Sequence, residues 1–133
     1  MFCAVVLMVG CSKSSSDTDN TIGWTGTYTN GLNPHSGINR VVISKADNND
    51  LQILLQEDSA SYIGTIATIR KAIIVNSSTF AVNENDTITT ISDSTFNFVA
   101  TGALSGNNLI MSGSATNIAK SNDVKNFYFS GSK

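Results

Sequence analysis

Side chains that alternate between apolar and polar along short segments are the feature that most constrains the fold of this chain. In an extended strand such alternation places the two kinds of side chain on opposite faces. The clearest case is 95–104, where Phe96, Phe98, Ala100 and Leu104 fall on one face and Asn97 and Thr101 on the other. No segment shows the sustained apolar spacing of a helix. The pattern therefore predicts an all-β domain.

Clusters of Asn, Asp, Gly and Ser separate the extended segments and predict turns. The turns fall at Asp47–Asp50, Asn83–Asp86 and Ser105–Asn108, among others. The strands expected between the turns cover residues 24–29, 40–45, 51–56, 62–69, 72–75, 79–82, 87–91, 95–104 as the longest, 109–116 and 125–130. The segment 72–75 either continues 62–69 or pairs with it. Strands this short, following one another in the chain, are typical of antiparallel sheets.

We therefore predict a small antiparallel up-and-down β-barrel of about eight strands, with a β-sandwich as the alternative. A barrel has no exposed edge strands, whereas a sandwich protects its edges with charged residues or proline. Pro34 is the only proline, and charged residues make up 14% of the chain. Closure is therefore favoured. The length of 133 residues and the net charge of −2 suit one domain.

The first ten residues are almost wholly apolar. Cys11 follows Gly10, and the sequence then becomes polar. This segment is too short for a membrane-spanning helix but long enough for the apolar part of a secretory signal. It resembles the lipobox of bacterial lipoproteins. That resemblance implies a signal peptide at 1–10, lipidation of Cys11, a flexible tether at 11–21 and a barrel domain at 22–133. The alternative is a buried first strand that contains an ordinary cysteine.

A second resemblance concerns the beginning of the barrel. Gly23-Trp24 followed by Gly26-Thr27-Tyr28 resembles the first-strand signature of lipocalin-like, calycin-type barrels. Residues 102–109 and 127–133 are similar to small lipocalin-like lipoproteins of Bacteroidota. The resemblance implies that Trp24 plugs the closed end of the barrel, with the cation of Lys125 or Lys133 across its ring. It also implies an outer-membrane lipoprotein of the cell envelope, on either the periplasmic or the surface face.

Two non-catalytic functions are consistent with the aromatic side chains that the strand pattern directs inward. The inward set is Trp24, Tyr28, Ile53, Phe80, Phe96, Phe98, Met111, Phe127 and Phe129. The first function is a binding module for a small apolar or amphipathic ligand. The second is a structural or protein-interaction barrel whose interior these side chains fill completely. Residue bulk favours the filled interior, and the family resemblance favours the ligand.

The sequence offers no constellation for catalysis, a metal or a cofactor. His35 is the only histidine, and no Gly-x-Ser-x-Gly motif is present. Asp47–Asp50 and Asn83–Asp86 lack the glycine and distal glutamate of a calcium loop. The eight Lys and Arg are scattered, which argues against nucleic acid. We expect no enzyme activity, no cofactor and no metal; the expected partners are the membrane, through the anchor, and a small ligand or a protein.

Overall fold

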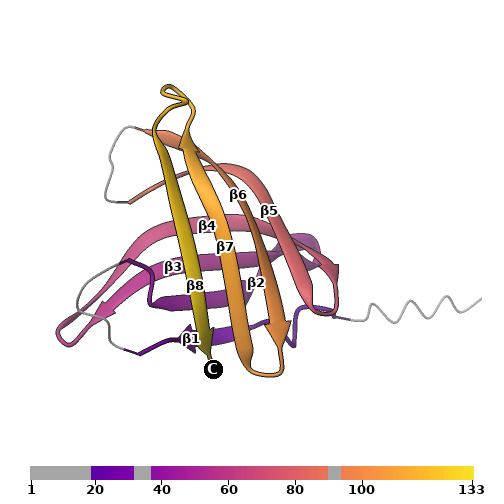
Figure 1. Cartoon of the computed structure of the whole chain (residues 1–133). Coiled ribbons are helices and arrows are strands. Elements are labelled where there is room, and N and C mark those ends of the chain that lie inside the picture. Colours follow the sequence, from indigo (N-terminus) through magenta and orange to yellow (C-terminus); the bar gives the residue numbers. More distant parts are fainter. Residues whose placement is uncertain (1–18, 32–36, 90–93) are drawn as a thin grey trace, which may run out of the picture.

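The computed structural model describes residues 19–31, 37–89 and 94–133 and shows an all-β fold. Eight antiparallel strands follow one another in chain order around a closed barrel (Figure 1). The strands are β1 (Gly26–Thr29), β2 (Arg40–Lys45), β3 (Leu51–Ser59), β4 (Tyr62–Asn76), β5 (Thr79–Thr87), β6 (Thr95–Ser105), β7 (Asn108–Asn117) and β8 (Val124–Ser132). The predicted up-and-down barrel is confirmed. The sandwich is excluded because β8 also pairs with β1, at Thr29 and Ser132.

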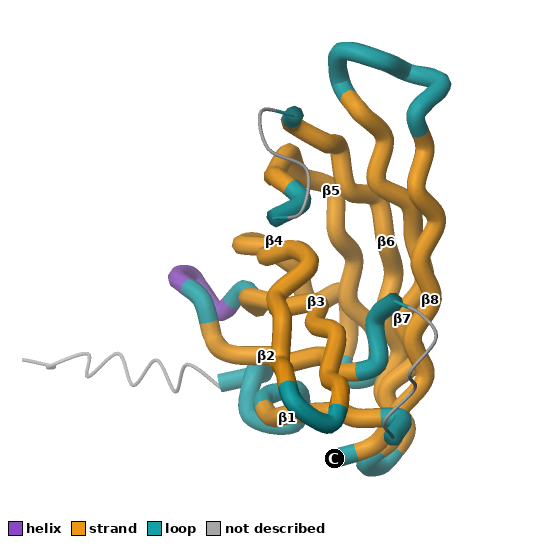
Figure 2. Tube along the Cα trace, turned by 90° about the vertical axis from the view of Figure 1, so that its left-hand side faces the viewer, coloured by secondary structure: helices purple, strands orange, loops and turns teal. Residues whose placement is uncertain are grey.

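Alternation of side chains explains the strands of the second half of the barrel. On β6, Phe96, Phe98 and Ala100 are buried, while Val99 between them is half-exposed. Their backbones pair without interruption with β5 on one side and with β7 on the other. Figure 2 shows β5–β8 as long strands on one side of the molecule and β1–β3 on the other. The period-two pattern therefore directs one set of side chains into the barrel interior and the other set to its outer surface.

The predicted turn at Asn83–Asp86 is wrong, because β5 continues through it to Thr87. Every residue of β5 has a partner on β6, from Thr79 opposite Ala103 to Thr87 opposite Thr95. This ladder outweighs the local turn preference of Asn and Asp. The predicted strand at 87–91 is also wrong in extent: Ile88 forms one isolated bridge, to Ala67. Residues 90 and 91 lie outside the described part of the chain.

The longest strand is β4, with 15 residues, rather than the predicted 95–104. The expected segments 62–69 and 72–75 join into one strand through an irregularity opposite Gln52, where the register with β3 shifts. Arg70 and Lys71 are both exposed at this point, as expected for a bulge that interrupts the alternation. The bulge brings Ile69 and Ala72 back to the interior on either side of it.

The 3₁₀ turn η1 (Asp47–Asn49) connects β2 to β3, where the turn was predicted. Asn48 and Asn49 both have positive φ, a conformation that Asn adopts more readily than most residues. Within the described residues, no helix has the length and the apolar character needed to cross a bilayer.

The two ends of the barrel differ. Residues 19–25, the turns after β2, β4 and β6, and the C-terminus lie at one end, which we call the closed end (Figure 1). Strands β1, β3, β5 and β7 end at the opposite end, which we call the open end. At the closed end the ring of Trp24 is 1% exposed and packs edge-on against Phe80, with 5.2 Å between ring centroids. The buried Tyr28 hydroxyl donates a hydrogen bond of 2.8 Å to the Trp24 carbonyl. Burial raises the pKa of Tyr28.

The cation at the closed end differs from the sequence prediction. The Lys133 ammonium lies 5.3 Å from the centroid of the Tyr28 ring, instead of crossing Trp24. It also donates hydrogen bonds to the carbonyls of Gly23, at 2.8 Å, and Thr25, at 3.2 Å. Lys133 therefore holds the turn that carries Trp24, and its contact with the tryptophan is indirect. Lys125 lies at the open end, near the start of β8.

Asp19 attaches the segment before β1 to the barrel. Its carboxylate accepts a 2.7 Å hydrogen bond from Lys45 and further bonds from the backbone and hydroxyl of Thr21. These bonds, that from Lys45 first, lower the pKa of Asp19 to about 2. A carboxyl with a lowered pKa stabilises the fold above its unfolded pKa, and the contribution disappears as the pH falls toward the folded pKa.

We expect Lys45→Met to raise the pKa of Asp19 toward the ordinary value of 3.8. The substitution removes the strongest donor to the carboxylate and leaves Thr21 in place. A carboxyl-carbon NMR titration measures the shift. Lys71→Met is the matched control, because its ammonium lies near Asp50 instead. An Asp19 pKa that responds equally to both substitutions would contradict the assignment of Lys45 as the main cause.

Candidate functional site

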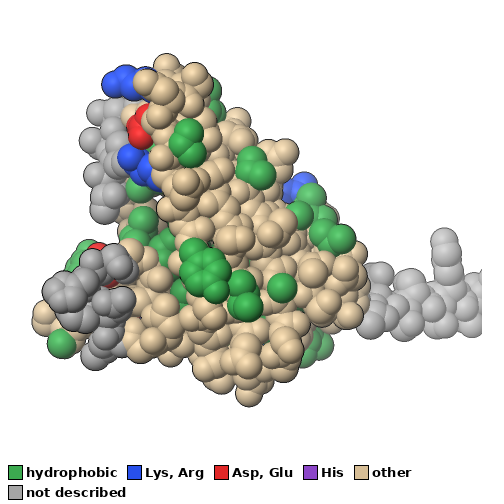
Figure 3. Space-filling model, viewed as in Figure 1, with side chains coloured by type: hydrophobic (Ala, Val, Ile, Leu, Met, Phe, Trp, Pro, Cys, Tyr) green, Lys and Arg blue, Asp and Glu red, His purple; other side chains and the backbone are tan. Residues whose placement is uncertain are grey.

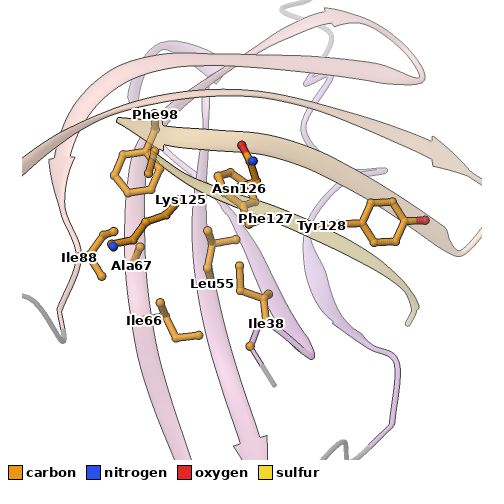
Figure 4. A pocket seen from close by; sticks show the side chains of 12 residues that line it. Ile38, Leu55, Ile66, Ala67, Ile88, Phe98, Lys125, Asn126, Phe127 and Tyr128 are labelled. Atoms are coloured by element: carbon orange, nitrogen blue, oxygen red, sulfur yellow. The ribbon is translucent and has the colours of Figure 1, made fainter. Parts of the chain in front are cut away.

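A cavity of about 520 Å³ lies at the open end of the barrel (Figure 4). One wall consists of Leu55 on β3 with Ile66 and Ala67 on β4. The facing wall consists of apolar side chains of the last three strands: Phe98 on β6, Ala115 on β7 and Phe127 on β8. Gly37, Ile38, Ile88, Lys125, Asn126 and Tyr128 complete the lining. The cavity is therefore apolar on both walls.

Two phenylalanines form much of the wall on the β6–β8 side. The rings of Phe98 and Phe127 are tilted by 54° with centroids 6.4 Å apart. Phe98 is 1% exposed, whereas Phe127 is only partly buried. Phe127 therefore presents part of its ring to the cavity, beside the buried Phe98.

The short β1 strand is the reason for the opening. Only four residues form β1, and among the described residues it pairs with β8 at a single position, Thr29 with Ser132. Most of β8 therefore has a ladder partner on the β7 side alone within this part of the chain. Ile38, which precedes β2, lies beside the cavity at this seam (Figure 4).

Lys125 is the one charged side chain among the described residues that line the cavity. It shares the inward parity of Phe127 and Phe129, and its stem lies beside Phe98 and Ile88 (Figure 4). Its ammonium donates a 3.0 Å hydrogen bond to Asp123, and this bond is the main cause that lowers the pKa of the Asp123 carboxyl. The pair is about 40% exposed, so it lies in contact with water at the cavity mouth.

The predicted interior set divides between the core and the cavity. The buried members are Trp24, Tyr28, Ile53, Phe80, Phe96, Phe98, Met111 and Phe129. Phe127 is the partly buried member, and with Phe98 it lines the cavity. The closed end is thus filled by side chains, whereas at the open end a cavity remains beside the buried Phe98.

Several cavity residues were not assigned to the barrel interior from the sequence. Lys125 could have been found, because it precedes Phe127 and Phe129 at the same parity. Ile88 continues the inward parity of Phe80 and Val82, but the turn assigned to Asn83–Asp86 concealed this. Ile38 has no sequence signal, since it lies outside any strand. Cys11 and His35 fall outside the described residues.

One buried carboxylate lies in the barrel wall. Asp86 is 6% exposed, and its Oδ2 has no hydrogen-bond partner; Arg70 Nε lies 3.7 Å away. The backbone ladder between β4 and β5 is interrupted here, and Arg70 N donates to Glu84 instead of to a β5 carbonyl. Asp86 is not part of the cavity lining. In the part of the chain that the structure describes, no group of three or more His, Cys, Asp or Glu could hold a metal ion.

No protein-family model, curated protein or solved structure matches this chain. We therefore infer the function from the barrel and its cavity. The cavity can hold an apolar group through burial alone, worth roughly 25 cal/mol for each Å² removed from water. Lys125 adds one positive charge at the mouth.

Proposed function

We propose that this protein is a lipid-anchored, non-catalytic binding module of the cell envelope, of lipocalin-like type, that holds a small amphipathic ligand in the open-end cavity. The observation that supports this most is the apolar cavity of about 520 Å³. Ligand sites are typically apolar hollows of about 300–1,000 Å³ with few polar groups. The cavity fits that description, with Lys125 as its one charged lining residue among those described.

Lys125 favours a ligand with an anionic head group. An apolar body between Leu55 and Phe127 would place its polar end at the mouth, within reach of the ammonium. The ligand would have to displace Asp123 from Lys125. An exposed ion pair of this kind contributes only about 0–1 kcal/mol, so the displacement costs little.

The anchor is the second part of the proposal. A diacylglycerol joined to the Cys11 sulfur by a thioether, with a further acyl chain on its amine, would hold the domain on a membrane, at about 0.8 kcal/mol for each buried methylene. Because residues 19–25 lie at the closed end, such an anchor would join the barrel at the end opposite the cavity mouth. Mass spectrometry of the protein extracted from membranes should show acylated Cys11. An unmodified chain that retains Met1 would contradict this part.

The binding proposal predicts a selective loss of affinity in Ala67→Phe. Ala67 is 1% exposed and lines the cavity, so a phenyl ring there occupies ligand space. We expect dodecanoate to bind the native protein and to lose at least about tenfold in affinity in the variant, a change of about 1.4 kcal/mol. Isothermal titration calorimetry, with dodecanoate below its critical micelle concentration, measures the affinity of the native protein and that of the variant.

Matched controls separate the cavity from other surfaces. Ala103→Phe makes the same chemical change on the exposed outer side of β6 and should leave dodecanoate affinity unchanged. Lys125→Gln should weaken dodecanoate but not dodecanol. If neither compound binds the native protein, the cavity proposal fails. If both bind but Lys125→Gln weakens neither, only the preference for an anionic head group fails.

A further inference from the structure

The outer face of the four strands β5–β8 carries no charged side chain. The outward positions of these strands hold only Ser, Thr, Asn, Ala, Val, Ile and Tyr. The three charged residues of the same strands, Glu84, Asp86 and Lys125, all occupy inward positions. We call the outward positions of β5–β8 the neutral face. Figure 3 shows this side of the molecule, with blue and red atoms only toward its margins.

Exposed apolar side chains also lie on the neutral face. Val99, Ile110, Val124 and Tyr128 project from β6, β7 and β8 and are 48–63% exposed. Ile73, on the adjoining end of β4, is 53% exposed and lies in one register row with Ala81, Thr101, Ser112 and Tyr128. Depletion of charge together with exposed aromatic and aliphatic side chains is the compositional signal of a protein interface.

Charged residues border the neutral face without entering it. Arg70 and Lys71 lie beyond Ile73 on β4, and Lys120 and Asp123 lie in the connection between β7 and β8. A neutral centre with charged margins is the usual anatomy of an interface. Four strands about 4.8 Å apart and about 30 Å long give the face a projected area of roughly 600 Å². A standard interface buries roughly 800 Å² per partner and weak, transient ones bury less, so the face is large enough for a weak interface.

We propose that the neutral face is an interface on which two copies of this chain associate about a two-fold axis. A face without charge meets its own copy with no like-charge repulsion and buries no unpaired ion. Its many Ser, Thr and Asn side chains indicate a weak and reversible dimer rather than an obligate one. A two-fold interface is self-complementary, so each side chain on the face contributes twice.

The test is sedimentation velocity of the full chain in detergent, with micelles in large excess, over a dilution series. We expect a reversible shift between monomer and dimer. Val99→Lys and, separately, Ile110→Lys should weaken the association at least about tenfold, because each places two like charges at the interface. Neither residue lines the open-end cavity. Circular dichroism establishes that each variant is folded.

Two controls identify the surface responsible. Ile63→Lys changes a residue that is as exposed as Val99 but lies at the β3–β4 turn, and it should leave the dimer intact. Association through the neutral face should also be insensitive to salt, because salt screens only charges. A chain that stays monomeric throughout, a dimer that high salt dissolves, or a dimer that survives both Val99→Lys and Ile110→Lys overturns the proposal.

Discussion

Trp24→Ala is expected to lower the free energy of unfolding by about 4 kcal/mol, near the middle of the range for buried aromatic truncations. The indole is 1% exposed and packs against Phe80. Its removal leaves a cavity at the closed end, where Tyr28 and Lys133 hold the surrounding turn by hydrogen bonds to backbone carbonyls. Because those bonds fix the backbone, the turn has little freedom to collapse into the space. Urea unfolding followed by circular dichroism measures the loss.

Tyr128→Ala is the matched control for Trp24→Ala. Tyr128 is also a large aromatic residue, but it is 63% exposed on the outside of β8. Its truncation should change the free energy of unfolding by less than about 0.5 kcal/mol. If the two variants lose similar stability, Trp24 does not close the barrel in the way described. An unchanged m-value in both would show that the denatured state is not responsible for the difference.

The last three strands of the barrel follow directly from the sequence. On β6 and β8 the apolar residues alternate without interruption, as at Phe96 and Phe98 or Phe127 and Phe129, and both strands form where they were expected. Each strand has one face in the core and one outside, so burial alone specifies which side chains point inward. The hairpin turn between β6 and β7 was likewise identifiable from Gly106 and the asparagines beside it.

The middle strands, β4 and β5, were harder to predict because long-range pairing there overrides the local preference of the residues. Asn83–Asp86 has the composition of a turn, but nine consecutive pairs with β6 hold it extended. On β4, the irregularity at Arg70 and Lys71 shifts the alternation by one residue, so two expected segments proved to be one strand. No local sequence pattern predicts either effect, since each depends on pairing with a neighbouring strand.

The aromatic residues that line the cavity could be predicted from the sequence, but the presence of the cavity could not. The inward parity of Phe98 and Phe127 was evident, and that of Lys125 could have been inferred from the same strand. Whether inward side chains meet or leave a hollow depends on how far the walls stand apart. Here that separation follows from a β1 strand of only four residues, which joins β8 at Ser132 alone within the described chain.

Gly113→Val is expected to lower the free energy of unfolding by about 3 kcal/mol, at the upper end of the usual cost of overpacking. Gly113 is an inward position of β7, opposite Ala100 on β6 and Phe127 on β8. A Cβ atom there would lie 2.4 Å from Ala100 Cβ and 2.5 Å from the carbonyl oxygen of Val99. Neither atom can rotate away, because one is fixed to the backbone and the other belongs to it. The strands themselves would have to separate.

Ser112→Val provides the comparison, because it introduces the same side chain at the adjacent residue of β7. Ser112 points outward and is exposed, and Val is favoured in strands, so the free energy of unfolding should change by no more than about 0.5 kcal/mol. Urea unfolding of both variants at low protein concentration distinguishes packing from strand propensity. Equal stability of the two would mean that β6 and β7 are not held as closely as the structure indicates. A selective loss in Gly113→Val would instead establish that the close approach of these strands at Gly113 contributes to the closure of the barrel.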